Sequence, residues 1–230
     1  MGSDSVAGES LLDGLKAVRE QLLAMGGEVE SQLRSAISGL VHRDLDVSEI
    51  VLGGDHSINR YHVQLDKECY ELLVGFRGNA QDIRTIVANI KINNELERIG
   101  DFAVKVAETT FRYLEHDPVK PLIDIPRMAD VAQGMLRDSL NAYVEQSTEI
   151  AQRVISRDAT VDGLHEQISR ELLGVMMNEQ KHTAASLNLL SITNCLERVG
   201  DHATNIAEDV IYMVAGRDVR HQGTGGFTDA

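Results

Sequence analysis

The feature that most constrains the fold of this chain is a fifteen-residue pattern that occurs twice. Residues 94–108 read NELERIGDFAVKVAE and residues 194–208 read NCLERVGDHATNIAE, with nine of the fifteen positions identical. Unrelated helical segments would agree at only about one or two positions, so we interpret the pattern as an internal duplication. A weaker correspondence pairs residues 54–63 with residues 157–166, shifted by three residues relative to the first. The sequence therefore predicts two copies of one unit whose loops differ in length.

The segment between the two copies holds every proline of the chain, at Pro118, Pro121 and Pro126. Because a helix interior tolerates proline poorly, this segment is predicted to be a linker. We accordingly expect one three-helix repeat over residues 9–117 and a second over residues 122–216. Residues 217–230 are predicted to form a disordered tail.

Both halves show the apolar periodicity of helices. From Leu11 to Leu40, apolar residues recur at steps of three and four, which predicts one long bundle helix. Glycines at 53–54 and in the segment 75–79 are expected to interrupt the first half. Further helices are expected at residues 79–116, 122–156, 159–177 and 183–214, the last ended by Gly216. The predicted fold class is all-α, with two tandem symmetric three-helix bundles.

The composition excludes several classes of function. With 36 acidic and 22 basic residues, the formal net charge is −14, which argues against a basic surface for nucleic acid or for anionic lipid. No stretch approaches eighteen unbroken apolar residues, and the first residues lack a secretory apolar region, so we expect a cytoplasmic protein without a membrane span. Cys69 and Cys195 lack C-x-x-C spacing and are expected to be core thiols.

The duplicated pattern carries a pair of carboxylates four residues apart, Glu97 and Asp101 in one copy and Glu197 and Asp201 in the other. This spacing places both side chains of a pair on one helix face, where like charges repel unless a cation neutralises them. Further oxygen ligands extend the same face, at Asn94 and Glu108 in the first copy and at Asn194, Asn205 and Glu208 in the second.

The weaker correspondence adds a second set of candidate ligands. Asp55, Asn59 and His62 share a helix face in one copy, as do Asp158, Asp162 and His165 in the other. Carboxylate and amide oxygens suit hard cations such as Mg²⁺, Mn²⁺ or Fe³⁺, and participation of histidine would widen the choice to Zn²⁺ or Fe²⁺. The alternative is a solvated acidic face in which Arg98 and Arg198 supply the counter-charge.

Two features of the pattern have two readings each. Gly100 and Gly200 cost about 1 kcal/mol each relative to alanine within a helix, which points either to close helix packing or to room for an ion. Arg98 and Arg198 follow the glutamates and are expected to anchor the neighbouring helix by a salt bridge, a contact with phosphate being the alternative.

The sequence does not support a stand-alone catalyst. It contains no P-loop, no G-x-G-x-x-G, no H-E-x-x-H and no G-x-S-x-G. A di-iron bundle would need a Glu-x-x-His on each of two helices, and Glu179–His182 is a single candidate at a predicted turn. We therefore predict that the protein is not an enzyme.

The chain resembles the PhoU family of phosphate-transport and phosphate-signalling regulators. The matching blocks occur in order along nearly the whole chain, at residues 23–30, 77–84, 96–101, 196–202 and 210–221. The resemblance implies a six-helix architecture of two three-helix bundles. It also implies metal clusters, of iron or zinc, at the Glu/Asp-x-x-x-Asp motifs that fall on Glu97/Asp101, Glu197/Asp201 and Asp158/Asp162. The fourth motif departs from the pattern, because Asp55 is followed by the neutral Asn59, and the first site is expected to be weaker.

The resemblance also implies a function. The family member would be a homodimeric negative regulator of the phosphate-starvation response that modulates phosphate uptake. It would act as a peripheral adaptor between the ATPase subunit of the phosphate ABC transporter and a membrane sensor histidine kinase. Two alternatives remain open: a helical scaffold without functional metal, and a metal-storage or di-iron-like bundle.

Overall fold

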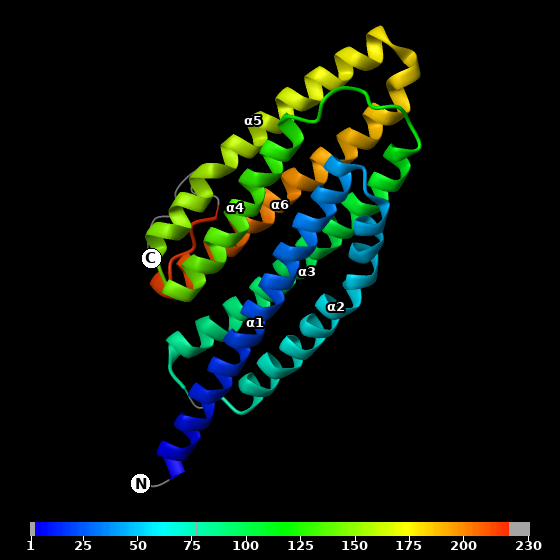
Figure 1. Cartoon of the computed structure of the whole chain (residues 1–230). Coiled ribbons are helices and arrows are strands. Elements are labelled where there is room, and N and C mark those ends of the chain that lie inside the picture. The colour runs from blue at the N-terminus through cyan, green and yellow to red at the C-terminus, as the bar shows by residue number, and fades with distance from the viewer. Residues whose placement is uncertain (1–2, 77, 221–230) are drawn as a thin grey trace.

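Six long helices form the protein in a computed structural model that describes residues 3–76 and 78–220, with only the backbone described for residues 3–10 and Asp55 (Figure 1). The helices are α1 (Ser3–His42), α2 (Leu45–Val74), α3 (Ala80–Leu114), α4 (Asp124–Glu145), α5 (Thr148–Asn178) and α6 (Thr183–Ala215). A short 3₁₀ helix, η1 (Gln180–His182), precedes α6. The described part of the chain contains no strand, so the all-α prediction is confirmed.

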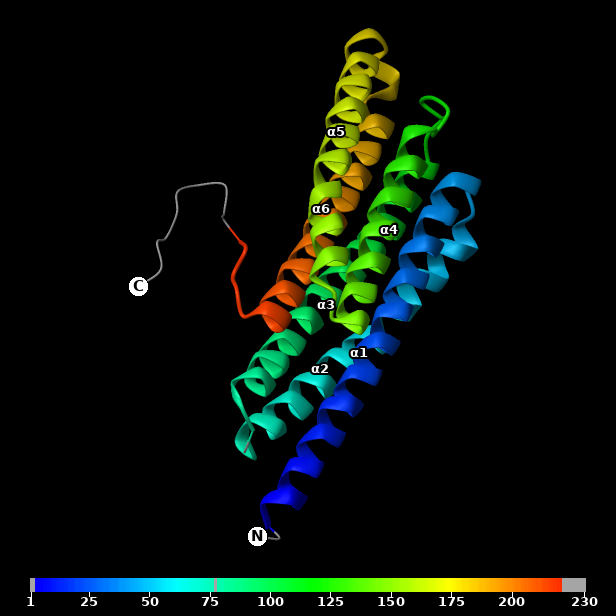
Figure 2. The ribbon, with the colours of Figure 1, turned by 90° about the vertical axis from the view of Figure 1, so that its left-hand side faces the viewer.

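The helices form two bundles of three, α1–α3 and α4–α6, that lie side by side (Figure 2). The most extensive contact between any two helices is that of α3 with α6, and a smaller contact joins α1 to α4. Within the described residues, the outer helices α2 and α5 pack only against helices of their own bundles. The tandem three-helix architecture is therefore confirmed, with the duplicated helices α3 and α6 at its centre.

Most predicted helices are found where they were expected. The apolar residues from Leu11 to Leu40 all lie on α1. Asn79 caps α3 through a capping box with Asp82, and Gly216, in the left-handed region at φ 66°, ends α6. Pro118 and Pro121 lie in the connection between α3 and α4, and Pro126 lies in the first turn of α4, where a missing N–H costs little.

Two predicted boundaries are wrong. Gly53–Gly54 lies inside α2, and the chain breaks instead at Arg43 and Asp44. Arg43 adopts a left-handed conformation (φ 55°), and the Asp44 carboxylate accepts hydrogen bonds from the first backbone N–H groups of α2. A helix tolerates glycine at modest cost, whereas a polar cap beside a left-handed residue starts a new helix.

The same turn recurs in the second repeat. The break predicted between residues 156 and 159 is wrong, because α5 continues through it from Thr148 to Asn178. The chain breaks instead at Gln146 (φ 49°) and Ser147, whose hydroxyl accepts a hydrogen bond from the Ile150 N–H at 3.3 Å. These residues stand 103 positions after Arg43 and Asp44, the same offset as the weaker sequence correspondence. The candidate ligands of the outer helices therefore lie in the middle of α2 and α5, well away from their ends.

The core is a continuous set of buried apolar residues from all six helices. Cys69 and Cys195 are free and buried within it, as predicted, and burial raises their pKa to about 12 and about 11. Residues 217–220 follow α6 without helical structure, and the rest of the predicted tail, from His221 onward, lies outside the described residues. No helix within the described ranges combines the length and apolarity needed to cross a bilayer.

Candidate metal site between the outer and central helices

The second repeat brings four candidate carboxylates together between α5 and α6. Burial raises the pKa of Asp158 above its usual value, and the negative charges of Asp162, Asp201 and Glu197 raise it further. The hydroxyl of Thr204 donates a 3.4 Å hydrogen bond to Asp158 Oδ1, which acts in the opposite direction. The face between α5 and α6 therefore accumulates negative charge and favours a positive counter-charge, whether a proton or a cation. We call these four residues, Asp158, Asp162, Glu197 and Asp201, the acidic groove.

Gly200 allows α5 and α6 to approach closely at this point. A Cβ at Gly200 would lie 3.3 Å from Val161 Cγ1 and 3.6 Å from Asp158 Oδ1. In the first repeat, a Cβ at Gly100 would lie 3.1 Å from Ile58 Cδ1 on α2. Close helix packing accounts for both glycines, and Gly200 in addition borders an oxygen of the acidic groove.

Two further candidates of the second repeat bridge the same helices. His165 Nε2 lies 2.7 Å from the side-chain oxygen of Asn194, which joins α5 to α6 one turn away from the acidic groove. An imidazole that donates through one nitrogen keeps the other as a potential ligand. This contact therefore joins the two helices that carry the acidic groove.

The arginines of the duplicated pattern pair with their own helix, and the expected bridge to a neighbouring helix is a wrong prediction. Arg198 lies 3.1 Å from Asp201 and 3.9 Å from Glu197. Arg98 likewise lies 3.8 Å from Asp101 and 3.7 Å from Glu97. Both arginine side chains are more than half exposed, because a side chain that follows the glutamate directly points away from the helix interface. Such exposed pairs are weak and exchangeable, worth about 0–1 kcal/mol.

The first repeat is arranged differently around its histidine. His62 Nε2 lies 3.7 Å from Asp66 Oδ2, one turn further along α2, and the buried Asn93 donates to both the His62 carbonyl and Asp66 at 3.0 Å. Asn94, the counterpart of Asn194, is exposed. Asn59 and Asp55 lie on the same helix, but the side chain of Asp55 is outside the described residues. Sequence comparison missed Asp66, although its position four residues after His62 was a usable signal.

The remaining candidates have other partners. Asn205 donates to Glu95 Oε2 at 3.0 Å across the interface between α3 and α6, and His202 Nδ1 lies 2.5 Å from the same oxygen. Lys105 lies 3.3 Å from Glu108, and Glu208 is half-buried on α6. Glu95 escaped sequence analysis because its counterpart in the second repeat is Cys195.

Glu179 and His182 lie at the turn between α5 and α6, as predicted, with His182 Nε2 3.3 Å from Glu179 Oε2. Among the described residues, no three histidine, cysteine, aspartate or glutamate side chains are grouped closely enough to hold a metal ion as they stand. The donor set of the acidic groove nevertheless fits a hard cation in chemistry, because all four members are carboxylates.

A duplicated three-helix unit with mirrored carboxylate pairs on its central helices defines an all-helical class of tandem-repeat proteins. The PhoU domain model matches residues 22–110 and 125–210, one match for each repeat, and the chain belongs to this family.

Relatives match over nearly the whole chain. The phosphate-specific transport system accessory protein PhoU homolog of Pseudomonas aeruginosa is 37% identical over 91% of this chain and 87% of its own length. The phosphate-specific transport system accessory protein PhoU of Escherichia coli is 33% identical over 91% of this chain and 87% of its own length.

Solved structures agree with the fold. The crystal structure of PhoU from Pseudomonas aeruginosa superposes with a TM-score of 0.86, at 35% identity, over 89% of this chain and 99% of that one. The crystal structure of PhoU from Streptococcus pneumoniae superposes with a TM-score of 0.84, over 91% of this chain and 99% of that one. At 23% identity, this similarity shows only that the two proteins share a fold.

Proposed function

We propose that this protein is a non-enzymatic regulatory accessory protein of phosphate transport that restrains the phosphate-starvation response. The observation that carries the proposal is the match of both repeats to the PhoU domain, together with relatives named as accessory proteins of the phosphate-specific transport system. In this role the protein is a cytoplasmic adaptor. It links the ATPase subunit of a phosphate ABC transporter to a sensor histidine kinase, and it reaches the membrane through these partners.

The geometry suits an adaptor because its long outer helices present faces to solvent. In the part of the chain that the structure describes, α2 and α5 contact only their own bundles, so each leaves one side open for a partner helix. The same property would allow a second copy to bind, and we propose a homodimer on the family resemblance.

We further propose that the acidic groove binds a cation. Its support is the accumulation of four carboxylates at one helix pair, with the pKa of Asp158 raised by burial and, further, by the charges of its neighbours. A bound cation would remove this repulsion, and participation of His165 would extend the choice from Mg²⁺, Mn²⁺ or iron to Zn²⁺. The first repeat would bind more weakly, because Asn59 is neutral and His62 faces Asp66.

The signalling role is tested by deleting the gene and measuring phosphate-starvation transcripts in phosphate-rich medium. We expect high transcript levels in the deletion strain and repression after complementation. Unchanged levels in the deletion strain would remove the proposed role.

The cation is tested by measuring the metal content of protein purified without chelator. We expect metal in the wild type and its loss in Asp158→Asn/Asp201→Asn, whereas Glu166→Gln, on the exposed side of α5, should keep it. Arg98 and Arg198 each pair with an aspartate of their own helix, and these pairs favour the alternative of a scaffold without metal. That alternative would hold if all three preparations contained equally little metal and the double variant still repressed the transcripts.

A further inference from the structure

The acidic groove has a counter-charge within the chain, the guanidinium group of Arg198. Arg198 Nη1 donates a 3.1 Å hydrogen bond to Asp201 Oδ2, and Arg198 Nε lies 3.9 Å from Glu197 Oε2. Both contacts stay on α6, which carries all three residues. Within the described residues, no other basic side chain forms an ion pair with the four carboxylates of the groove. Arg198 is therefore the counter-ion of the groove.

The basic residue next to the groove on α5 has a different partner. Arg157 directly precedes Asp158, yet its guanidinium group lies 2.6 Å from Asp138 on α4. A Cβ at Gly134 on α4 would lie 2.8 Å from Arg157 Nη2, so the missing side chain leaves room for this contact. In the described ranges, Asp158 and Asp162 on the α5 side of the groove form no ion pair.

Arg198 neutralises the groove only in part. Burial raises the pKa of Asp158, and the charges of the other three carboxylates raise it further, although two of these three contact Arg198. A guanidinium group brings one positive charge and reaches only the α6 side. A divalent cation brings two charges and binds several carboxylate oxygens at once. The groove therefore gains more from a divalent cation than from its arginine.

The arginine and a cation would use the same oxygen atoms. Asp201 Oδ2 and Glu197 Oε2 are the atoms that face Arg198, and they belong to the carboxylates that a cation would need on α6. A divalent cation bound to these oxygens would repel a guanidinium group a few ångströms away. Displacement of the arginine costs little, because its side chain is 61% exposed and exposed ion pairs are weak.

We propose that Arg198 is an exchangeable counter-ion that competes with a divalent cation for the acidic groove. When no cation is bound, its guanidinium group neutralises the α6 carboxylates, and a cation that enters the groove displaces it into solvent. Arg198 thereby lowers the affinity of the site and sets the cation concentration at which the site fills. This inference rests on the proposed cation site and adds the residue that tunes it.

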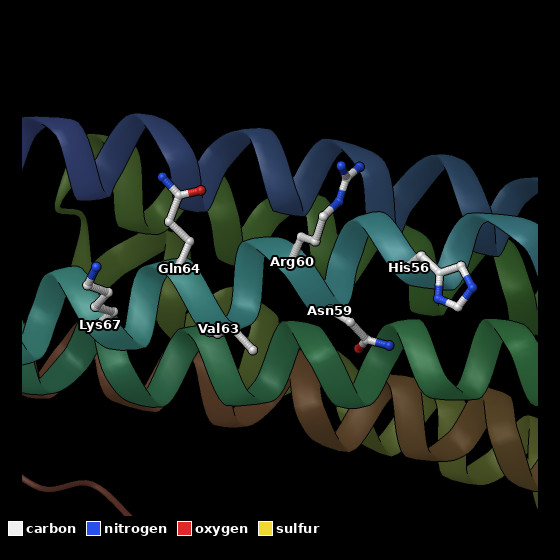
Figure 3. Close-up of a pocket in the computed structure, with 6 residues that line it drawn as sticks. All are labelled: His56, Asn59, Arg60, Val63, Gln64 and Lys67. Atoms are coloured by element: carbon white, nitrogen blue, oxygen red, sulfur yellow. The ribbon is translucent and has the colours of Figure 1, made fainter.

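The first repeat has the same arginine in a looser arrangement. Arg98 lies 3.7 Å from Glu97 and 3.8 Å from Asp101. On α2 the counterpart of Asp162 is the neutral Asn59, which points toward α3 (Figure 3). Asn59 lines a shallow surface pocket of about 480 Å³ whose lining residues include no carboxylate. Because this repeat has fewer carboxylates to neutralise, the competition is expected chiefly in the second repeat.

The test measures Mn²⁺ binding to the full-length protein by electron paramagnetic resonance of the free ion. Binding by Asp158→Asn/Asp201→Asn is subtracted, which corrects for Mn²⁺ held on other acidic faces of the chain. We expect Arg198→Gln to bind Mn²⁺ about three- to fivefold more tightly than the wild type, the range that one exposed ion pair can supply. Arg198→Lys keeps the charge and should stay within twofold of the wild type.

Arg170→Gln is the matched control. It removes the same charge from an exposed pair on α5, with Glu166 at 2.6 Å, that does not involve the groove. Its Mn²⁺ affinity should stay within twofold of the wild type, and Arg98→Gln should tighten binding less than Arg198→Gln does. Raised salt should narrow the difference between Arg198→Gln and the wild type, because salt screens exposed charges. Circular dichroism checks that each variant is folded.

Several outcomes would overturn the proposal and leave the cation site in place. These are equal or weaker binding by Arg198→Gln, and equal tightening by Arg198→Lys, Arg170→Gln or Arg98→Gln. If the wild type and Arg198→Gln bind no more Mn²⁺ than Asp158→Asn/Asp201→Asn, the proposed cation and this inference fail together. The regulatory role is judged separately, by the starvation transcripts of the deletion strain.

Discussion

Phe102 and His202 occupy equivalent positions in the two repeats, and their rings contact each other between α3 and α6, with centroids 5.5 Å apart and planes inclined by 36°. A residue that meets its own counterpart marks the axis relating two copies of a unit. The hydrogen bonds around this contact are not duplicated, because Glu95 accepts from His202 and Asn205 while its counterpart is Cys195. A symmetric ring contact with asymmetric polar partners therefore joins the repeats.

Replacement of His202 by phenylalanine should keep the ring contact and remove a hydrogen bond to the Glu95 carboxylate. We expect the free energy of unfolding to fall by about 1–3 kcal/mol, because a charged and mostly buried acceptor loses one of its two partners. Urea denaturation followed by circular dichroism measures the change. Adding Asn205→Ala should cost more than the two single substitutions combined, and simple additivity would show that the two donors do not share one acceptor.

The ion pair between the half-buried Lys91 and the buried Asp209 should be a large contributor to the packing of α3 on α6. The Lys91 ammonium lies 2.9 Å from Asp209, which is only 5% exposed. Burial raises the pKa of Asp209, and Lys91 opposes this effect. We expect Lys91→Met to destabilise the protein by about 3 kcal/mol, because it leaves a buried charge without its counter-ion.

The double variant Lys91→Met/Asp209→Leu should recover most of that loss, since apolar replacement of both partners is often neutral. Lys105→Met is the matched control, because its pair with Glu108 is exposed and worth about 0.5 kcal/mol. Chemical denaturation of all four proteins gives the comparison. A loss in the double variant as large as in Lys91→Met would contradict the reasoning.

After metal has been removed with a chelator, the acidic groove should make the protein less stable as pH rises through the folded-state pKa of Asp158. Burial and the neighbouring carboxylates raise that pKa above its ordinary value of 3.8, so the folded state holds the proton more tightly than the unfolded state. The stabilisation is complete below the unfolded pKa and is lost above the folded one. Because the site is partly solvated, we expect an effect below about 1 kcal/mol.

Asp158→Asn should remove the pH dependence of stability that Asp158 causes, and it should stabilise the chelator-treated protein at pH 7. Urea titrations between pH 4 and pH 7, with the exposed Glu166→Gln as control, measure it. An added divalent cation should stabilise the wild type and not Asp158→Asn. Identical pH profiles for wild type and Asp158→Asn would show that the groove does not concentrate charge.

Two glycines should respond in opposite ways to alanine. Gly163 lies in the middle of α5 with nothing within 4 Å of a Cβ, so Gly163→Ala should stabilise the protein by about 1 kcal/mol through helix propensity. A Cβ at Gly39 would lie 3.1 Å from the Asp44 carbonyl oxygen and would collide with the Ser48 hydroxyl. We expect Gly39→Ala to cost about 1–3 kcal/mol by overpacking the turn between α1 and α2. Thermal unfolding separates the two, and stabilisation by both would refute the close approach at Gly39.

The failures of sequence analysis share one physical origin. The break after α1 depends on Arg43 in a left-handed conformation and on the Asp44 cap, which are weaker local signals than the glycine pair at 53–54. Arg98 and Arg198 were expected to reach across to another helix, but each returns to the carboxylate three residues on. In both cases the competing local interactions differ by less than about 1 kcal/mol, so a sequence pattern cannot rank them.

By itself the sequence determined the all-helical class, the duplication, the linker and the faces on which the paired carboxylates lie, because helical periodicity and proline act locally along the chain. Only the tertiary structure decided that Asp158 and Asp201 lie close enough between α5 and α6 to interact, and that Glu95 joins the two repeats. These relationships join residues far apart in the chain, and they depend on how the helices pack and rotate against one another, which no local pattern specifies.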